Sequence, residues 1–174
     1  QKTAYEIRNC DWSSDVCSSD LNDASRGPKA LAQAYIDQGL AMVDAGRIIS
    51  SGMLATEYLR LKVKSGTVAY LGTRASAHYL EEVGLRTLSI ADLDLGESDD
   101  VNALVFLDDE GFDWNHDINK VVNLLRRRNI PAIVANTDQS YPASSREVAI
   151  AIGGMANMVE AITGRRLIRS EEHT

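Results

Sequence analysis

The sequence has little of several residue types, and each shortage excludes a class of protein. It contains two cysteines and three histidines, and no second Cys/His cluster completes the ligand shell of a zinc site or a disulfide framework. No apolar run approaches the roughly 20 residues of a membrane span. The formal net charge is −7, and an acidic chain argues against nucleic acid as the main partner.

The two ends of the chain have no pattern of secondary structure that we recognise. Back-translated, the segment DWSSDVCSSDL resembles a common short-read sequencing adapter, and the final RSEEHT resembles the start of the complementary adapter. We therefore expect residues 1–21 and 169–174 to be adapter-derived and the chain to be an internal fragment of a longer protein. A metal-binding loop and a natural disordered tail at each end are the alternatives.

Setting the end segments aside changes what composition implies. Residues 22–168 contain no cysteine and carry a net charge of about −4. A cysteine-free chain fits a cytoplasmic location, since disulfides mark oxidising compartments. The length suits one ordinary domain. Segments without an evolved fold should not pack onto the rest.

Within residues 22–168, apolar runs alternate with helical patterns. The spacing predicts helices over residues 28–39, 51–62, 76–83, 116–128 and 153–164, the second capped by Ser50 or Ser51. Strands are predicted at residues 68–71, 86–89, 103–107 and 132–135. The acidic stretch IADLDLGESDD predicts a solvated loop. Strand, helix and strand in this order imply an α/β fold with parallel pairing.

Polar loops follow the predicted strands, where α/β proteins place their sites. The loop DDEGFDW contains Asp108, Asp109 and Glu110, which suit either a divalent cation or a solvated turn. His116 is a candidate general base, with a surface residue or a helix-capping residue as the alternatives. The GTRAS turn offers backbone N–H groups to an anion, although its single glycine is far short of a dinucleotide fingerprint.

The order of motifs resembles the haloacid dehalogenase-like (HAD) phosphatases of subclass IIA, which carry a large α/β cap. NDASR resembles a phosphate-binding motif whose first residue is replaced by Leu21. RIISSGMLATEYL is similar to the segment that leads from core to cap. VANTDQSYP resembles a cap signature with its substrate-specificity loop, and IAIGGMANMVEAITGRR resembles the helix that leads back to the core.

This resemblance implies two domains, both incomplete or interrupted. Residues 22–65 would be part of a Rossmann-like core, residues 66–147 an α/β cap with a mostly parallel sheet, and residues 148–168 the helix returning to the core. We accordingly expect residues 22–62 and the final helix to form a second, incomplete layer beside the cap sheet.

The chemistry implied by the resemblance is hydrolysis through an aspartyl-phosphate, with Mg²⁺ in the full-length parent. The nucleophile, the lysine and the metal-binding carboxylates of the family would lie outside this chain. We therefore predict no catalytic or metal-binding residue here, no tight binding of a cofactor, and no activity of the chain alone.

Six residues match positions of the family's motifs. The backbone N–H of Asn22 is implied to bind phosphate. The residues implied to contact substrate are Asp23, Arg26, Asn136, Asp138 and Tyr141. A loop-fixing role is the alternative for Asn136 and Asp138, and packing on its own loop is the alternative for Tyr141.

The function implied is that of a phosphatase acting on a small phosphorylated metabolite of the sugar, nucleotide or glycolate/glycerol phosphate type. We expect no nucleic-acid or membrane partner, and the cap is a candidate homodimer surface. Two other functions stay open: a non-catalytic α/β module that binds an anion or sugar through GTRAS and ANTDQSYP, and a dimerising interaction module.

Overall fold

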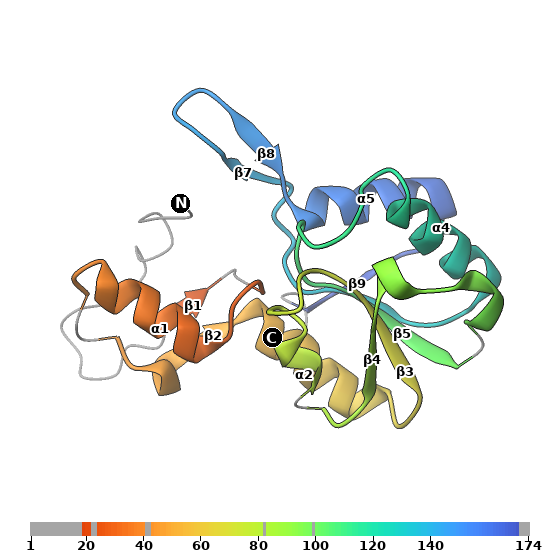
Figure 1. The fold of residues 1–174 in the computed structure, drawn as a ribbon, viewed down its shortest axis with the longest axis horizontal. Coiled ribbons are helices and arrows are strands. Elements are labelled where there is room, and N and C mark those ends of the chain that lie inside the picture. Colours follow the sequence, from red (N-terminus) through yellow and green to blue (C-terminus); the bar gives the residue numbers. More distant parts are fainter. Residues whose placement is uncertain (1–18, 22–23, 41–42, 82, 99, 171–174) are drawn as a thin grey trace.

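The centre of the molecule is a five-stranded parallel sheet with the strand order β4-β3-β5-β6-β9. The computed structural model describes residues 19–21, 24–40, 43–81, 83–98 and 100–170. The strands are β3 (Thr67–Leu71), β4 (Arg86–Ser89), β5 (Val101–Phe106), β6 (Ala132–Val134) and β9 (Ile168–Arg169) (Figure 1). The expected α/β fold with a mostly parallel sheet is confirmed.

The inner strands are apolar on both faces because helices cover both faces of the sheet. In β5, Leu104 and Phe106 point into one core cluster, and Ala103 and Val105 point into the other. All residues of β3 and β6 are buried. This explains why the sequence shows continuous apolar runs rather than alternation.

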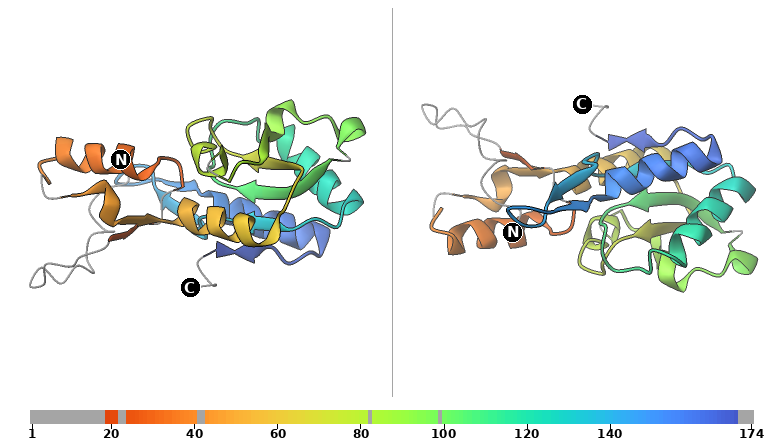
Figure 2. Two further views of the ribbon diagram at one scale, coloured as in Figure 1. Left: turned by 90° about the horizontal axis from the view of Figure 1, so that it is seen from below. Right: turned by 90° about the horizontal axis from the view of Figure 1, so that it is seen from above.

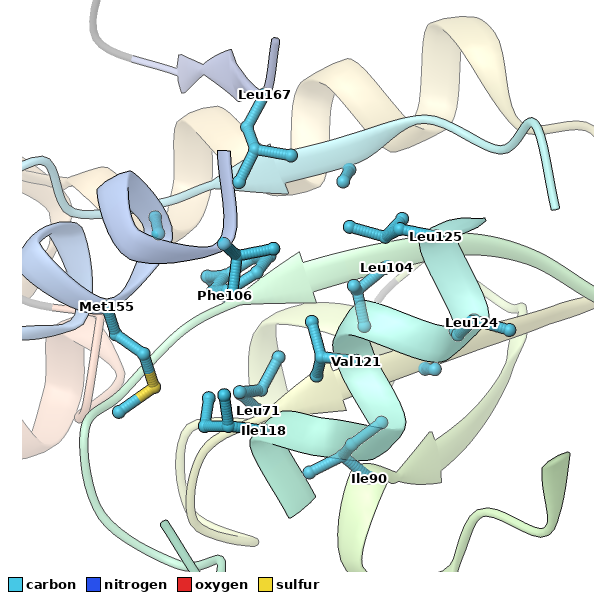
Figure 3. Packing of buried hydrophobic residues seen from close by; sticks show 14 of the residues in the cluster. Leu71, Ile90, Leu104, Phe106, Ile118, Val121, Leu124, Leu125, Met155 and Leu167 are labelled. Atoms are coloured by element: carbon cyan, nitrogen blue, oxygen red, sulfur yellow. The ribbon is translucent and has the colours of Figure 1, made fainter. Parts of the chain in front are cut away.

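One face of the sheet is covered by α4 (Asp117–Arg127) and α5 (Ile152–Thr163). Phe106 of β5, Val121 of α4 and Met155 of α5 belong to this cluster and are at most 1% exposed (Figure 3). Burying side chains of this size contributes about 1.5–3 kcal/mol each. Gly164 ends α5 in the left-handed conformation, as expected from the sequence.

The opposite face is covered by α2 (Ser51–Lys62) and the short α3 (His78–Glu81). Ala55 and Leu59 of α2 are fully buried in the same cluster as Val68 and Val105. We expected α2 and the final helix to belong to a second layer, and that expectation is wrong. A sheet apolar on both faces requires helices on both. The division into core and cap at residues 65 and 147 stays a prediction.

A small unit lies at one end of the molecule, beside the main sheet (Figures 1 and 2). It contains β1 (Ser19–Leu21), α1 (Pro28–Asp37), the 3₁₀ turn η1 (Ala45–Arg47) and β2 (Ile48–Ser50). β1 and β2 pair in parallel. Leu31 and Ala32 of α1 pack on Ile48, and this cluster is separate from those of the main sheet.

Parts of both end segments pack onto the rest, contrary to expectation. Ser19–Leu21 pairs with β2, and Arg169 extends β9. Ser170 is 3% exposed, and its hydroxyl donates to the carbonyl oxygen of Ala135 at 3.1 Å. A strand edge offers backbone groups to any extended neighbour, whatever its side chains. Trp12 lies outside the described residues, and the adapter origin stays a prediction.

Two further features differ from the sequence prediction. The expected acidic loop contains two 3₁₀ turns, η2 (Ile90–Asp92) and η3 (Leu95–Glu97). Ile90 and Leu93 are buried in the core cluster, so the segment is not a solvated loop throughout. Apolar residues spaced between acidic ones anchor it to the sheet.

The second feature is an antiparallel hairpin that the sequence analysis did not predict. The hairpin consists of β7 (Ser140–Pro142) and β8 (Val148–Ile150), which follow β6 and precede α5 in the sequence. It projects from the body of the molecule (Figure 1). None of the helices in the described part of the chain has the length and apolar character to cross a membrane.

Candidate functional site

A cleft of about 390 Å³ lies between the α1 segment and the loop that follows β5. One wall comes from α1 and the residues before it, and the other from the β5 loop and the hairpin. The residues that line it are Ser25, Arg26, Leu31, Ala34, Tyr35, Gln38, Asp108, Asp109, Glu110 and Tyr141. The carboxyl end of parallel strands is where α/β folds bind their ligands.

Asp109 and Tyr141 lie in the wall formed by the β5 loop and the hairpin, which we call the sheet-side wall. The Tyr141 hydroxyl donates a hydrogen bond to Asp109 Oδ2 at 2.8 Å, which joins the hairpin to the β5 loop. The backbone of Asp109 is also held, because Trp114 Nε1 donates to its carbonyl oxygen at 3.0 Å. Asp109 is 8% exposed. The sequence had not linked these two residues.

The acidic surroundings of Tyr141 change its ionisation. The hydrogen bond to Asp109, burial and the negative charges of Asp109, Glu110 and Asp108 raise the pKa of Tyr141 to about 12. Each of these effects favours the neutral phenol. At neutral pH, Tyr141 therefore stays protonated and uses its single proton in the hydrogen bond to Asp109.

The β5 loop has its shape because Gly111 allows a close approach. Gly111 has a φ of +87°, and a Cβ atom there would lie 2.6 Å from the carbonyl oxygen of Gly72. The GTRAS turn therefore packs directly against the acidic loop. A side chain at residue 111 would push Asp109 and Glu110 away from this turn.

The opposite wall contains Arg26, one of the residues predicted to contact substrate. Its side chain is exposed, and its carbonyl oxygen accepts a hydrogen bond from the buried Tyr79 hydroxyl. Ser50 occupies the N-cap position of α2, but its hydroxyl bonds Tyr79 rather than capping the helix. The expected side-chain cap is therefore wrong, and the hydroxyl fixes the cleft wall instead.

Asn136 and Asp138 lie beside the cleft and do not line it. Asn136 is 5% exposed, and its Oδ1 accepts the backbone N–H of Asp138 at 2.8 Å. Asp138 is exposed. A Cβ atom on Gly153 would lie 2.4 Å from the carbonyl of Thr137, so the start of α5 presses on this loop. This geometry gives Asn136 a loop-fixing hydrogen bond.

The predicted phosphate-binding Asn22 and its neighbour Asp23 lie outside the described residues. His116 begins α4 with an exposed side chain, pairs with Asp117 at 3.0 Å, and does not line the cleft. His116 makes no side-chain capping hydrogen bond, so its exposed position fits a surface residue better than a capping residue or a general base.

The residues present do not fit a magnesium site. Within the described ranges, no group of three or more His, Cys, Asp or Glu side chains is arranged to hold a metal ion. Asp109 directs one carboxylate oxygen to the Tyr141 hydroxyl. The interpretation of residues 108–110 as a cation site therefore has no support in the geometry.

Sequence analysis did not predict Tyr35, Gln38 or the acidic residues as parts of one cleft. Tyr35 and Gln38 share a helical face with Leu31. Only folding brings that face opposite the β5 loop, more than 60 residues away. The available signal was the position of Asp108–Glu110 directly after a buried strand.

No family model and no curated protein matches the chain. Solved structures do match. A possible sugar phosphatase of the HAD superfamily from Cytophaga hutchinsonii is 58% identical, with a TM-score of 0.80, and the match covers 85% of this chain and 52% of that one.

More distant structures have the same fold. A glycerol phosphate phosphatase from Mycobacterium tuberculosis, solved with calcium, is 22% identical with a TM-score of 0.72, covering 87% of this chain and 42% of that one. A 4-nitrophenylphosphatase from Thermotoga maritima is 20% identical with a TM-score of 0.69, covering 86% and 52%. The chain thus has the α/β fold of part of these phosphatases and spans about half of their length.

Proposed function

We propose that this chain is a piece of a HAD-like phosphatase of subclass IIA that hydrolyses a small phosphorylated metabolite. The observation that carries this proposal is the 58% identity to a possible HAD sugar phosphatase over most of the chain. The glycerol phosphate and 4-nitrophenyl phosphate enzymes support the same reaction class. The motif order in the sequence points to the same family.

In this proposal the cleft holds the organic part of the substrate. Asn22 would bind the phosphate through its backbone N–H, and Arg26, four residues later, lines the cleft. Tyr141 lines the opposite wall, so the sheet unit would act as a cap that closes over the ester and excludes water. Asp23, Asn136 and Asp138 would shape the entrance and its loop.

The bond-breaking step belongs to residues outside this chain. A HAD-like reaction uses an Asp nucleophile, and Mg²⁺ supplies charge neutralisation when bound. The described residues offer no metal site. What they contribute is binding, orientation and exclusion of water. Positioning alone leaves a phosphate monoester almost inert, so we expect the chain by itself to be inactive.

The test compares the chain with a version completed by its neighbouring coding sequence. The completed enzyme should release phosphate from p-nitrophenyl phosphate with Mg²⁺, and replacing its upstream Asp nucleophile with Asn should abolish turnover. The chain alone should release none. Turnover by the repurified chain that stops with EDTA, or an inactive completed enzyme, would contradict the proposal.

A cytoplasmic location and a homodimer through the cap are further parts of the proposal. Sedimentation velocity of the completed enzyme tests the dimer, since a dimer and a monomer of this size separate clearly. A monomer at all concentrations would contradict it.

A further inference from the structure

The sheet-side wall of the cleft is negatively charged. Asp108, Asp109 and Glu110 come from one loop, and among the described residues that line the cleft only Arg26, on the facing wall, is cationic. Asp108 and Asp109 are 7% and 8% exposed. Charges buried to this degree are screened far less by solvent and salt than surface charges. A second anionic group on a ligand would meet this wall at a cost.

The wall also offers only hydrogen-bond acceptors at its centre. Asp109 Oδ2 accepts from the Tyr141 hydroxyl at 2.8 Å, which uses the phenol's single proton. Among the described residues, no group donates a hydrogen bond to Asp109 Oδ1. That carboxylate oxygen is therefore available to a ligand that carries hydrogen-bond donors. Hydroxyl and ammonium groups meet this requirement, whereas carboxylate and phosphate groups do not.

The hydrogen bonds hold the acceptors in place. Trp114 Nε1 fixes the carbonyl oxygen of Asp109, and the Asp109 N–H donates to Asp108 Oδ1 at 2.9 Å. The hydrogen bond to Asp109, followed by burial and the charges of the three carboxylates, raises the pKa of Tyr141. A fixed group discriminates between ligands more strongly than a mobile one, because it does not move away from an unfavourable partner.

Resting on the proposed function, we propose that this wall makes the enzyme selective for phosphate monoesters whose organic part is a neutral polyol or carries an amine, against esters with a second anionic group. Asp109 is the specificity-determining residue, and Tyr141 positions it. Of the substrate types implied by the resemblance, sugar and glycerol phosphates fit this wall. Phosphoglycolate does not.

The test uses the completed enzyme and two matched pairs of esters. Glycerol 3-phosphate is compared with 3-phosphoglycerate, and glucose 6-phosphate with 6-phosphogluconate, because each pair differs by a carboxylate. The wild-type enzyme should prefer the neutral member of at least one pair by tenfold or more in kcat/KM. Asp109→Asn, which keeps the shape and removes the charge, should reduce that preference about tenfold, mainly through a lower KM for the anionic ester.

Two variants sharpen the result. Asp92→Asn removes a carboxylate from an exposed turn away from the cleft and should leave the preference unchanged. Tyr141→Phe should weaken the preference, because it releases Asp109 from its hydrogen bond without removing the charge of Asp109.

The outcomes separate the two claims. An active enzyme that hydrolyses both members of each pair equally, prefers the anionic members, or keeps its preference after Asp109→Asn would overturn the selectivity. A completed enzyme that hydrolyses no ester, p-nitrophenyl phosphate included, would overturn the proposed function and the selectivity with it.

Discussion

The hydroxyl of Tyr79 donates a hydrogen bond to the carbonyl oxygen of Arg26 at 2.5 Å, across 53 positions of sequence. Because the phenol's only proton is used there, the Ser50 hydroxyl must be the donor in its 2.6 Å contact with Tyr79. Tyr79 is 1% exposed. One buried side chain of α3 therefore fixes both the Arg26 wall of the cleft and the junction between β2 and α2.

Replacing Tyr79 by Phe should lower the free energy of unfolding by about 1–2 kcal/mol, because the buried Ser50 hydroxyl and the part-buried carbonyl oxygen of Arg26 lose their hydrogen bonds to Tyr79. Amide hydrogen exchange should also accelerate at residues 27–31, next to Arg26. Tyr70→Phe is the control, since Tyr70 is also a buried tyrosine but lies in β3 of the main sheet. Unchanged exchange in this segment after Tyr79→Phe would show that the bond does not hold the wall.

Gly153→Ala tests the contact between α5 and the loop after β6. Alanine has the higher helix propensity, by about 1 kcal/mol. Here its Cβ atom would lie 2.4 Å from the Thr137 carbonyl. We expect a net loss of about 1–3 kcal/mol in urea unfolding. Gly46→Ala is the control, because its Cβ atom would meet Asp44 at an ordinary 3.5 Å. A more stable Gly153→Ala variant would contradict the packing.

Tyr141 should titrate with a pKa of about 12, because its hydroxyl donates a hydrogen bond to Asp109 and burial opposes its ionisation. In the unfolded chain the value is near 10. The folded state therefore holds the proton more tightly, so this stabilisation is complete below pH 10 and is lost as pH rises from 10 to 12. The measurement is the phenolate absorbance of wild type minus that of Tyr141→Phe. Asp109→Asn should bring the pKa back toward 10, and a wild-type value of 10 would refute the hydrogen bond.

Glu160 joins α5 to β9. Its carboxylate accepts hydrogen bonds from Arg169, at 2.9 and 3.0 Å, and from the backbone N–H of Leu167. The hydrogen bond from Arg169 is the main cause of its lowered pKa. The carboxylate therefore stabilises the fold above its unfolded pKa of about 4.5, and this contribution disappears as pH falls through the lower folded value.

Glu160→Gln should accordingly cost about 1 kcal/mol at pH 7. Urea unfolding should show a smaller difference from wild type at pH 3 than at pH 7. Glu57→Gln, on an exposed position of α2, is the control and should have little effect at either pH. An equal cost of Glu160→Gln at both pH values would rule out the ion pair as the cause.

The main strands were predictable because their signal is local. A run such as VAYL or ALVFL is apolar at every position, which is typical of a parallel strand covered on both faces. Gly164 ended the last helix as expected. The short β7–β8 hairpin was missed because its strands of three residues are largely exposed and carry no apolar alternation.

Local patterns in the sequence were enough for the α/β class, for the positions of β3, β4, β5 and β6 and for the polar loops that follow strands, since periodicity and turn residues act over a few positions. The tertiary structure alone decided which helices cover which face and which loops meet. Asp109 and Tyr141 are 32 positions apart, and Tyr79 and Arg26 are 53 apart. Such pairs form only when packing of the sheet and its helices brings distant segments together, and the cleft is composed of these long-range contacts.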